Sequence, residues 1–345
     1  MSEPAVDLND EFSLKCLQET VPVCVFGIVP PPETVPVEKR NQLVDSVGAA
    51  LARLALDAFV VYDVQNEAGR DGTERPFPYT PAHDNRAFCA DVRDAIRRTA
   101  SANGSAVPTP ILYRAMCARP KADVPAWLAA THSEPLAIRH LVLVGHSAAN
   151  SSADSFASLA EATAVVRAGA ERFALGGVTL PERHGAKRDE HVRLLGKHTA
   201  QTAFFISQVV YSADLAIMLL RDYAAECRAR GHAPRRIVLC FSPFSRVSVV
   251  RLLRWLGCEV PAGIEARVLS APQPGDECVE LIVEIFRRVL ETARRRRFGV
   301  PIGFLVESIS RFKDDADNAH RLVPLLRAEL QHHCDEVQKQ RQSAE

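Results

Sequence analysis

The sequence lacks several kinds of segment, and each absence excludes a class of protein. No apolar run reaches the roughly 20 residues that a bilayer-spanning helix needs, so we expect no membrane protein. The opening segment, MSEPAVDLNDEFSLK, lacks the basic and apolar regions of a secretory signal peptide. Lys plus Arg and Asp plus Glu both number 42, so the zero net charge provides no electrostatic attraction to nucleic acid. Together these observations indicate a soluble, cytoplasmic protein.

Cysteine spacing gives no sign of a metal centre or a disulfide framework. The sequence has nine cysteines, none of them in a C-x-x-C pair or a metal-binding cluster. Several lie inside apolar runs with strand character, which is typical of reduced thiols in a protein core. We therefore predict no bound metal.

What the sequence does contain is a repeated unit, a short β-rich apolar run followed by an amphipathic helical stretch. Helical spacing is clear in SADLAIMLLRDYAAECRARG and ECVELIVEIFRRVLETARRRR. The β-rich runs cover residues 21–29, 58–64, 109–116, 140–146, 173–180, 202–210, 236–243 and 300–308.

The number and character of these units favour a single-domain (β/α)8 barrel, a TIM barrel, over residues 21–330. The runs are almost continuously apolar, as parallel strands covered by helices require. The alternative is an open doubly wound sheet, which usually carries a glycine-rich phosphate loop that this sequence lacks. We expect residues 1–20 and 331–345 to be solvated tails.

Polar residues recur where the predicted strands end, and the active site of a (β/α)8 barrel lies at that end. Each has a structural alternative: an aspartate can cap a turn, an arginine can belong to a buried ion pair, and a lone histidine is more often structural. Their accumulation at one end of the barrel predicts a ligand pocket. The residues concerned are Asp63, Tyr113, Arg114, His146, Glu182, His184, Gln208 and Glu307.

The segments GGVTLPERH and AFFISQVVYSAD resemble the fifth and sixth strands of the methylenetetrahydrofolate reductase family. In that family one strand ends in Tyr-Pro-Glu-x-His and the next in a run that closes on glutamine. VFGIVPPPET is similar to the family's first strand, IRHLVLVGH to its fourth, and RIVLCFSPFSRVSVVRLLRWLGCEVPAGI to its seventh with the following helix. The resemblance covers residues 22 to 310.

This resemblance implies a barrel that holds FAD and reduces a folate-type one-carbon substrate with NAD(P)H. It assigns Glu182, His184 and Lys197 to cofactor binding and Gln208 to the ring amide of the substrate. An amide suits that task because it both donates and accepts hydrogen bonds. We also assign substrate binding to Tyr113 and Arg114, which end the third strand.

Three positions depart from the family's pattern. Gly27 stands where the family has a catalytic glutamate, His146 where it has an aspartate beside the flavin, and Leu180 where it has a tyrosine. We therefore expect FAD to bind weakly, with His146 among its contacts. The candidates for a replacement acid are Asp63, His146, Glu182 and Glu307, of which we favour Asp63, His146 and Glu307 as catalytic.

Two functions remain open. The first is a flavin-dependent oxidoreductase of one-carbon metabolism, favoured by the polar strand ends. The second is a divergent barrel that binds a folate- or nucleotide-like ligand without reductase activity, favoured by Gly27. The expected partner is a small folate-like molecule rather than nucleic acid or membrane, and a homo-oligomer is compatible with the sequence. In the long loop after the second strand, Arg70 or Arg75 is predicted to meet an anionic group of the ligand.

Overall fold

Eight parallel strands pair in chain order, from β1 to β8, into a closed barrel. The computed structural model describes residues 10–66, 74–116, 119–145, 154–170, 172–199, 201–310 and 312–343. The (β/α)8 barrel predicted from the sequence is confirmed, and an open doubly wound sheet is excluded because its edge strands would not pair. The strands are β1 Cys24–Ile28, β2 Ala58–Val61, β3 Thr109–Ala115, β4 His140–Val144, β5 Ala174–Thr179, β6 Phe204–Val209, β7 Arg236–Phe241 and β8 Ile302–Glu307.

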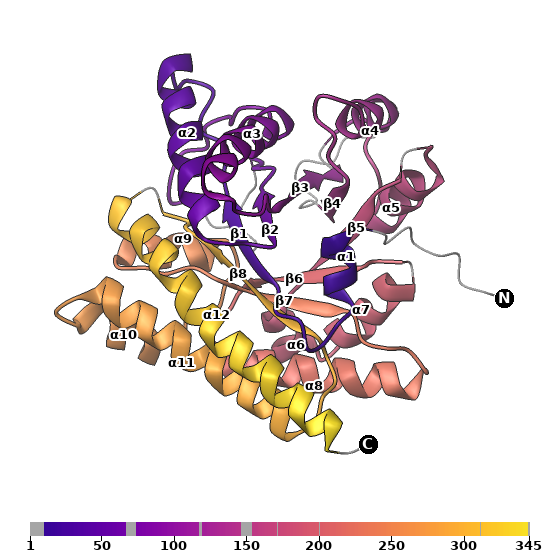
Figure 1. Ribbon diagram of the computed structural model, residues 1–345, viewed down its shortest axis with the longest axis vertical. Coiled ribbons are helices and arrows are strands. Elements are labelled where there is room, and N and C mark those ends of the chain that lie inside the picture. The colour runs from indigo at the N-terminus through magenta and orange to yellow at the C-terminus, as the bar shows by residue number, and fades with distance from the viewer. Residues whose placement is uncertain are drawn as a thin grey trace. The chain divides into compact units, whose positions relative to one another are not determined.

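Helices follow the strands along the chain, and Figure 1 shows them under the same labels. They are α1 Glu11–Cys16, α2 Val37–Arg53, α3 Asn85–Asn103, α4 Val124–His132, α5 Leu159–Ala168, α6 Pro181–Lys187, α7 Glu190–Thr199, α8 Ala213–Ala229, α9 Val247–Trp255, α10 Ala262–Ser270, α11 Pro274–Arg295 and α12 Lys313–Gln342. A short 3-10 helix at Lys121–Asp123 precedes α4.

Local side-chain bonds explain where several helices begin. Asp84 caps α3 by accepting from the backbone N–H of Arg86 and Ala87. Ser158 and Ser212 cap α5 and α8 in the same way. Such a cap satisfies an N–H that has no partner within the helix, and it stabilises the helix by about 1 kcal/mol.

The chain forms two compact units. The first covers Phe26–Gly176 and holds strands β2 to β4 with helices α2 to α5. Within it α2 packs closely on α3, because a Cβ at Gly48 would lie 2.5 Å from the Cβ of Ala95. A larger residue at this position would force the two helices apart.

The second unit joins Asn9–Val25 to Gly177–Glu345 and contains β6 to β8 and helices α6 to α12. Figure 1 shows its two longest helices, α11 and α12, running alongside each other. The face of α11 that is buried repeats at helical spacing, as in Ile282, Ile285, Phe286 and Val289. This apolar stripe fixes how α11 sits within the unit.

The segments expected to be solvated tails are ordered and packed where the structure describes them. Phe12 of α1 is buried and meets the Phe204 ring edge-on, with 5.4 Å between ring centroids. The fully buried Arg236 donates to the carbonyl oxygens of Lys15 and Val21, each at 2.9 Å.

At the other end α12 continues to Gln342, and Leu330, Cys334 and Val337 on it are buried. The sequence did not indicate these contacts, because a short amphipathic segment gives little sign of burial until the residues that it packs against are known. The domain boundaries at 21 and 330 stay a prediction.

Among the described residues, no helix combines the length and the apolar character that crossing a membrane requires.

Candidate functional site

In the first unit, Asp63 follows β2 and holds the end of β3 in place. Its Oδ2 accepts from the Ala115 backbone N–H at 3.0 Å, and its Oδ1 accepts from Gln65 Nε2 at 2.7 Å. Arg119 lies 3.6 Å from Oδ1 and Arg114 lies 3.9 Å from Oδ2, while the Asp63 side chain is only 7% exposed. The carboxylate predicted as a catalytic acid is therefore engaged by four neighbours, and its catalytic role stays a prediction.

The two residues assigned to substrate binding on β3 have different surroundings. Arg114 is buried, and its guanidinium lies 4.3 Å from the ring centroid of Trp127 on α4. Burial, followed by the positive charge of Arg119, lowers the pKa of Arg114 to about 10. Tyr113 is also buried, with its ring edge-on to Tyr62 at 4.8 Å. Arg114 thus contacts a helix of the unit's outer layer, and its role as a substrate contact stays a prediction.

In the second unit, a carboxyl group at the end of one strand contacts a thiol near the end of the adjacent strand. Glu307 is the last residue of β8, and its Oε1 lies 3.3 Å from Sγ of Cys240 near the end of β7. Burial, followed by the charge of Glu307, raises the pKa of Cys240 well above its ordinary value. Glu182, in the first turn of α6, contributes to the same rise. Cys240 is therefore a neutral thiol that contacts one carboxyl group.

An irregularity in β6 positions Gln208. The register of β6 against β7 shifts after Ile206, and Ser207 Oγ accepts from the Cys240 backbone N–H at 2.8 Å within this bulge. Gln208 Nε2 donates to the carbonyl oxygen of Leu256 at 2.9 Å. This bond gives Gln208 a structural role. It uses one of the four hydrogen-bonding positions on the amide, and the other three remain compatible with a ligand role. Bulges of this kind often re-aim a side chain next to an active site.

Two of the side chains assigned to FAD have partners within the protein, and their role in cofactor binding stays a prediction. His184 is fully buried, and its Nε2 lies 2.9 Å from Oδ2 of Asp222 on α8. Lys197 Nζ donates to the Val178 carbonyl oxygen at 2.5 Å. Burial lowers the pKa of Lys197, and the charge of Glu190 partly offsets that effect. Because the His184 imidazole contacts α8 and the Lys197 ammonium binds a strand carbonyl oxygen, we derive no chemical step through a flavin.

Some predicted site residues lie outside the described part of the chain. This applies to His146, which we assigned to both catalysis and cofactor binding, and to Arg70 of the long loop. Arg75 is described: it donates to the Gln65 carbonyl oxygen at 3.2 Å, and its guanidinium lies 5.3 Å from the Tyr79 ring centroid. Among the described residues, no three His, Cys, Asp or Glu side chains come together to hold a metal ion.

Sequence reasoning missed the thiol and the hydroxyl of this group. Cys240 and Ser207 were interpreted as strand interior, because nothing in a local pattern marks a buried thiol that faces a carboxylate. The signal available was position, since both lie near the end of a strand and Ser207 directly precedes the predicted site residue Gln208. Arg119, which approaches Asp63, carried no signal at all.

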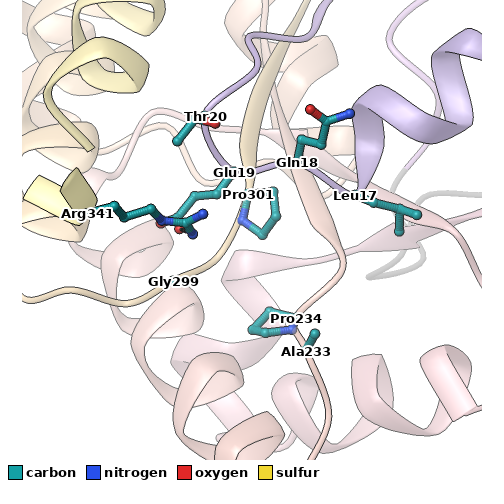
Figure 2. A pocket seen from close by; sticks show the side chains of 9 residues that line it. All are labelled: Leu17, Gln18, Glu19, Thr20, Ala233, Pro234, Gly299, Pro301 and Arg341. Carbon is teal, nitrogen blue, oxygen red and sulfur yellow. Dashed lines mark hydrogen bonds and ion pairs between the residues drawn. The ribbon is translucent and has the colours of Figure 1, made fainter. Parts of the chain in front are cut away.

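A cavity of about 370 Å³ lies elsewhere in the second unit, beside the amino-terminal ends of β7 and β8. Pro234 and Pro301, which precede these strands, line it together with Gln18. Figure 2 shows Arg341 extending toward Glu19, with which it forms an ion pair. Because the amino-terminal end of a (β/α)8 barrel serves stability rather than catalysis, this cavity does not mark the candidate site.

Comparison with known proteins agrees with the fold. A scan against protein-family models and a search of curated protein sequences found no match. A solved structure of an uncharacterised protein from Clostridium thermocellum, described as binding two copies of 5-methyl-5,6,7,8-tetrahydrofolic acid, is 22% identical, with a TM-score of 0.74 over 92% of this chain and 99% of that one. A type II Baeyer–Villiger monooxygenase from Pseudomonas putida in complex with FMN is 9% identical, with a TM-score of 0.49 over 88% of this chain and 97% of that one. The first likeness shows the fold, and the second is too remote to inform function.

Proposed function

We propose that this protein binds a reduced folate at the carboxyl-terminal ends of its strands. The observation that carries the proposal is the likeness to the Clostridium thermocellum protein, which extends over 99% of that chain and whose description names bound 5-methyl-5,6,7,8-tetrahydrofolic acid. A likeness over the whole barrel includes the strand ends, where barrels of this kind bind their ligands. The order of motifs from the first to the seventh strand, which resembles methylenetetrahydrofolate reductase, supports the same ligand class.

The chemistry of the strand ends in the second unit suits a pterin ring. A pterin edge presents N–H donors beside ring nitrogen and carbonyl acceptors, so it pairs with groups of both kinds. Gln208 keeps its Oε1 and a second amide N–H beyond the bond to Leu256. Glu182 and Glu307 offer carboxyl groups, which accept from ring N–H and exocyclic amino groups when ionised.

A second candidate is the reductase reaction itself, flavin-mediated hydride transfer between NAD(P)H and a folate-type one-carbon substrate. Two acidic residues favour this candidate. Glu182 and Glu307 carry carboxyl groups, whereas Gly27, at the position of the family's glutamate, carries none. The flavin would supply the hydride chemistry when bound, and the protein would supply substrate placement and the proton. The alternative is a binding barrel without reductase activity, and the surroundings of His184 and Lys197 favour it.

The binding proposal is tested by calorimetric titration of the purified protein with methyltetrahydrofolate. We expect saturable binding in the micromolar range, weakened about tenfold in Gln208→Leu because one polar contact to the ring is worth about 1.4 kcal/mol. The matched control is Gln18→Leu, which alters a glutamine at the amino-terminal end of the strands. Absence of saturable binding by the wild type would contradict the proposal.

The reductase candidate is separated from simple binding by two further measurements. One is the visible absorption spectrum, followed by titration of the protein with FAD, with Lys197→Ala as the comparison variant. The other is oxidation of NAD(P)H in the presence of methylenetetrahydrofolate. Folate binding with no FAD binding and no NAD(P)H oxidation would leave the binding barrel as the function.

A further inference from the structure

Three arginines are buried in the described part of the chain, and their guanidinium groups are treated differently. Arg93, which is 4% exposed, donates to the carbonyl oxygens of Pro135 and Leu136. Arg236, which is fully buried, donates to backbone carbonyl oxygens in the same manner. Arg114 is as buried as Arg93, at 4% exposed, but it donates no hydrogen bond to any described residue. The fold thus provides acceptors for two of these cations and not for the third.

Arg114 has an aromatic ring and a distant carboxylate as its neighbours. Its guanidinium carbon lies 4.3 Å from the ring centroid of Trp127. The carboxylate is that of Asp63, whose Oδ2 lies 3.9 Å from Arg114 Nη1, beyond hydrogen-bonding distance. Both oxygens of Asp63 already accept from other groups. Buried polar groups in native proteins nearly always have hydrogen-bond partners, because leaving them without one is costly. The free N–H groups of Arg114 therefore suit an acceptor supplied by a ligand.

The charges near Arg114 add up to one excess positive charge. Two cations, Arg119 and Arg86, and two carboxylates, Asp63 and Asp84, act on it electrostatically. Arg86 is paired with Asp84 at 2.9 Å, and Arg119 lies 3.6 Å from Asp63. Burial, followed by the charge of Arg119, lowers the pKa of Arg114 to about 10, so the guanidinium is still charged at neutral pH. Three guanidinium groups and two carboxylates are balanced by one further negative charge.

We propose that Arg114, stacked on Trp127 of α4, binds the carboxylate group of a small ligand in the first unit. A guanidinium donates two parallel hydrogen bonds along its edge, and the two oxygens of a planar carboxylate match this fork. The indole covers one face of the guanidinium, so the edge is what remains for the ligand. A carboxylate carries the single negative charge that balances the site, whereas a doubly charged phosphate exceeds it. The inference concerns the first unit alone and does not rest on the proposed folate binding.

Trp127 serves as an optical probe of this site. The sequence contains two tryptophans, so Trp255→Phe leaves Trp127 as the sole source of indole emission. This single-tryptophan protein is titrated with sodium acetate at neutral pH, with sodium chloride holding the ionic strength constant. We expect a saturable change in emission in the millimolar range, because an anion at Arg114 alters the positive charge that faces the indole. A parallel titration with inorganic phosphate should need higher concentrations.

Three variants in the same background assign the effect to the guanidinium. Arg114→Gln should abolish the saturable change with acetate. Arg114→Lys keeps the charge without the planar fork and should weaken acetate binding by about tenfold. The control is Arg98→Gln, which alters an exposed arginine of α3 paired with Asp45 and should respond as the background protein does. Circular dichroism verifies that each variant is folded, and Arg114→Lys decides the comparison if Arg114→Gln does not fold.

The outcomes either support or overturn the carboxylate site. A saturable acetate response that is weakened in Arg114→Lys and unchanged in Arg98→Gln supports it, whether or not methyltetrahydrofolate binds to the protein. No saturable response of Trp127 to acetate, or a response with the same midpoint in both Arg114 variants, overturns it. Saturation by phosphate at lower concentrations than acetate overturns the assignment of the ligand group as a carboxylate.

Discussion

Asp63 in the first unit and Glu307 in the second occupy comparable places, since each carboxyl group lies where a strand of the barrel ends. Their neighbours differ in kind. Asp63 accepts from a backbone N–H and a side-chain amide and has two guanidinium groups within 3.9 Å. Glu307 accepts from the buried thiol of Cys240.

The difference shows that a carboxyl group at the end of a strand can serve two different purposes. Asp63, which accepts from a backbone N–H and an amide and lies near two guanidinium groups, connects the segment after β2 to the end of β3. Glu307 ends β8, where barrels of this kind bind their ligands. We therefore expect substitutions of Asp63 to affect stability first, and substitutions of Glu307 to affect ligand binding first.

The largest effect is expected for Asp63→Ala. Removing this carboxylate leaves the buried Arg114 without its acidic neighbour and the Ala115 N–H without its acceptor, at a cost of about 3 kcal/mol in the free energy of unfolding. Urea denaturation followed by circular dichroism measures it. Glu307→Gln is the matched comparison and should change the same free energy by less than about 1 kcal/mol. Equal losses in the two variants would contradict the expectation that Asp63 has a structural role and Glu307 a ligand-binding role.

Ligand binding should rank the two carboxyl groups in the opposite order. In Glu307→Gln the side chain keeps its size but loses its ability to carry a proton or a charge, so we expect about a tenfold loss of affinity for methyltetrahydrofolate. Asp63→Asn, which keeps the size of the side chain and one acceptor oxygen, should bind nearly as the wild type does. Calorimetric titration at neutral pH compares the two variants. A larger loss of affinity in Asp63→Asn would indicate that the ligand contacts the first unit instead.

Acid pH should lower the free energy of unfolding of the second unit, because two of its imidazole side chains are buried. Burial, followed by the charge of Arg235, lowers the pKa of His198 from 6.5 to about 4, and burial, followed by Arg294, does the same for His333. The unfolded chain takes up these protons below pH 6.5 while the folded protein does not, so stability should fall as the pH drops from about 6.5 to about 4.

Urea midpoints measured across this pH range test the effect, with His198→Gln and His333→Gln combined as the comparison. The double variant should show a flatter dependence, because it lacks the two groups that protonate only on unfolding. A dependence as steep as that of the wild type would assign the acid sensitivity to other groups.

The smallest effect is expected for the bond between Gln208 and Leu256. Gln208→Met keeps the length of the side chain and removes one hydrogen bond to a carbonyl oxygen, which should cost about 1 kcal/mol of unfolding free energy. Gln331→Met, at an exposed glutamine bonded to Asp335 on α12, is the control and should cost less. A loss well above that of the control, together with unchanged folate affinity, would make Gln208 a structural residue only.

The sequence by itself determined the architecture. Apolar runs of strand length and amphipathic stretches of helical spacing are local properties, and their alternation through eight units already indicates a closed barrel because parallel strands must be covered by helices. It also determined which polar residues end the strands, as the positions of Asp63, Gln208 and Glu307 show.

Only the tertiary structure decided what those residues meet. Asp63 meets a backbone N–H 52 residues away, His184 meets Asp222 across 38 residues, and Glu307 meets Cys240 across 67. No local pattern carries such pairings, because they depend on which strands and helices become neighbours when the barrel closes. The same holds for α1, whose Phe12 becomes a buried residue only against Phe204. The charge state and the chemistry of a strand-end carboxyl group follow from these neighbours, since solvation and nearby charge set its pKa.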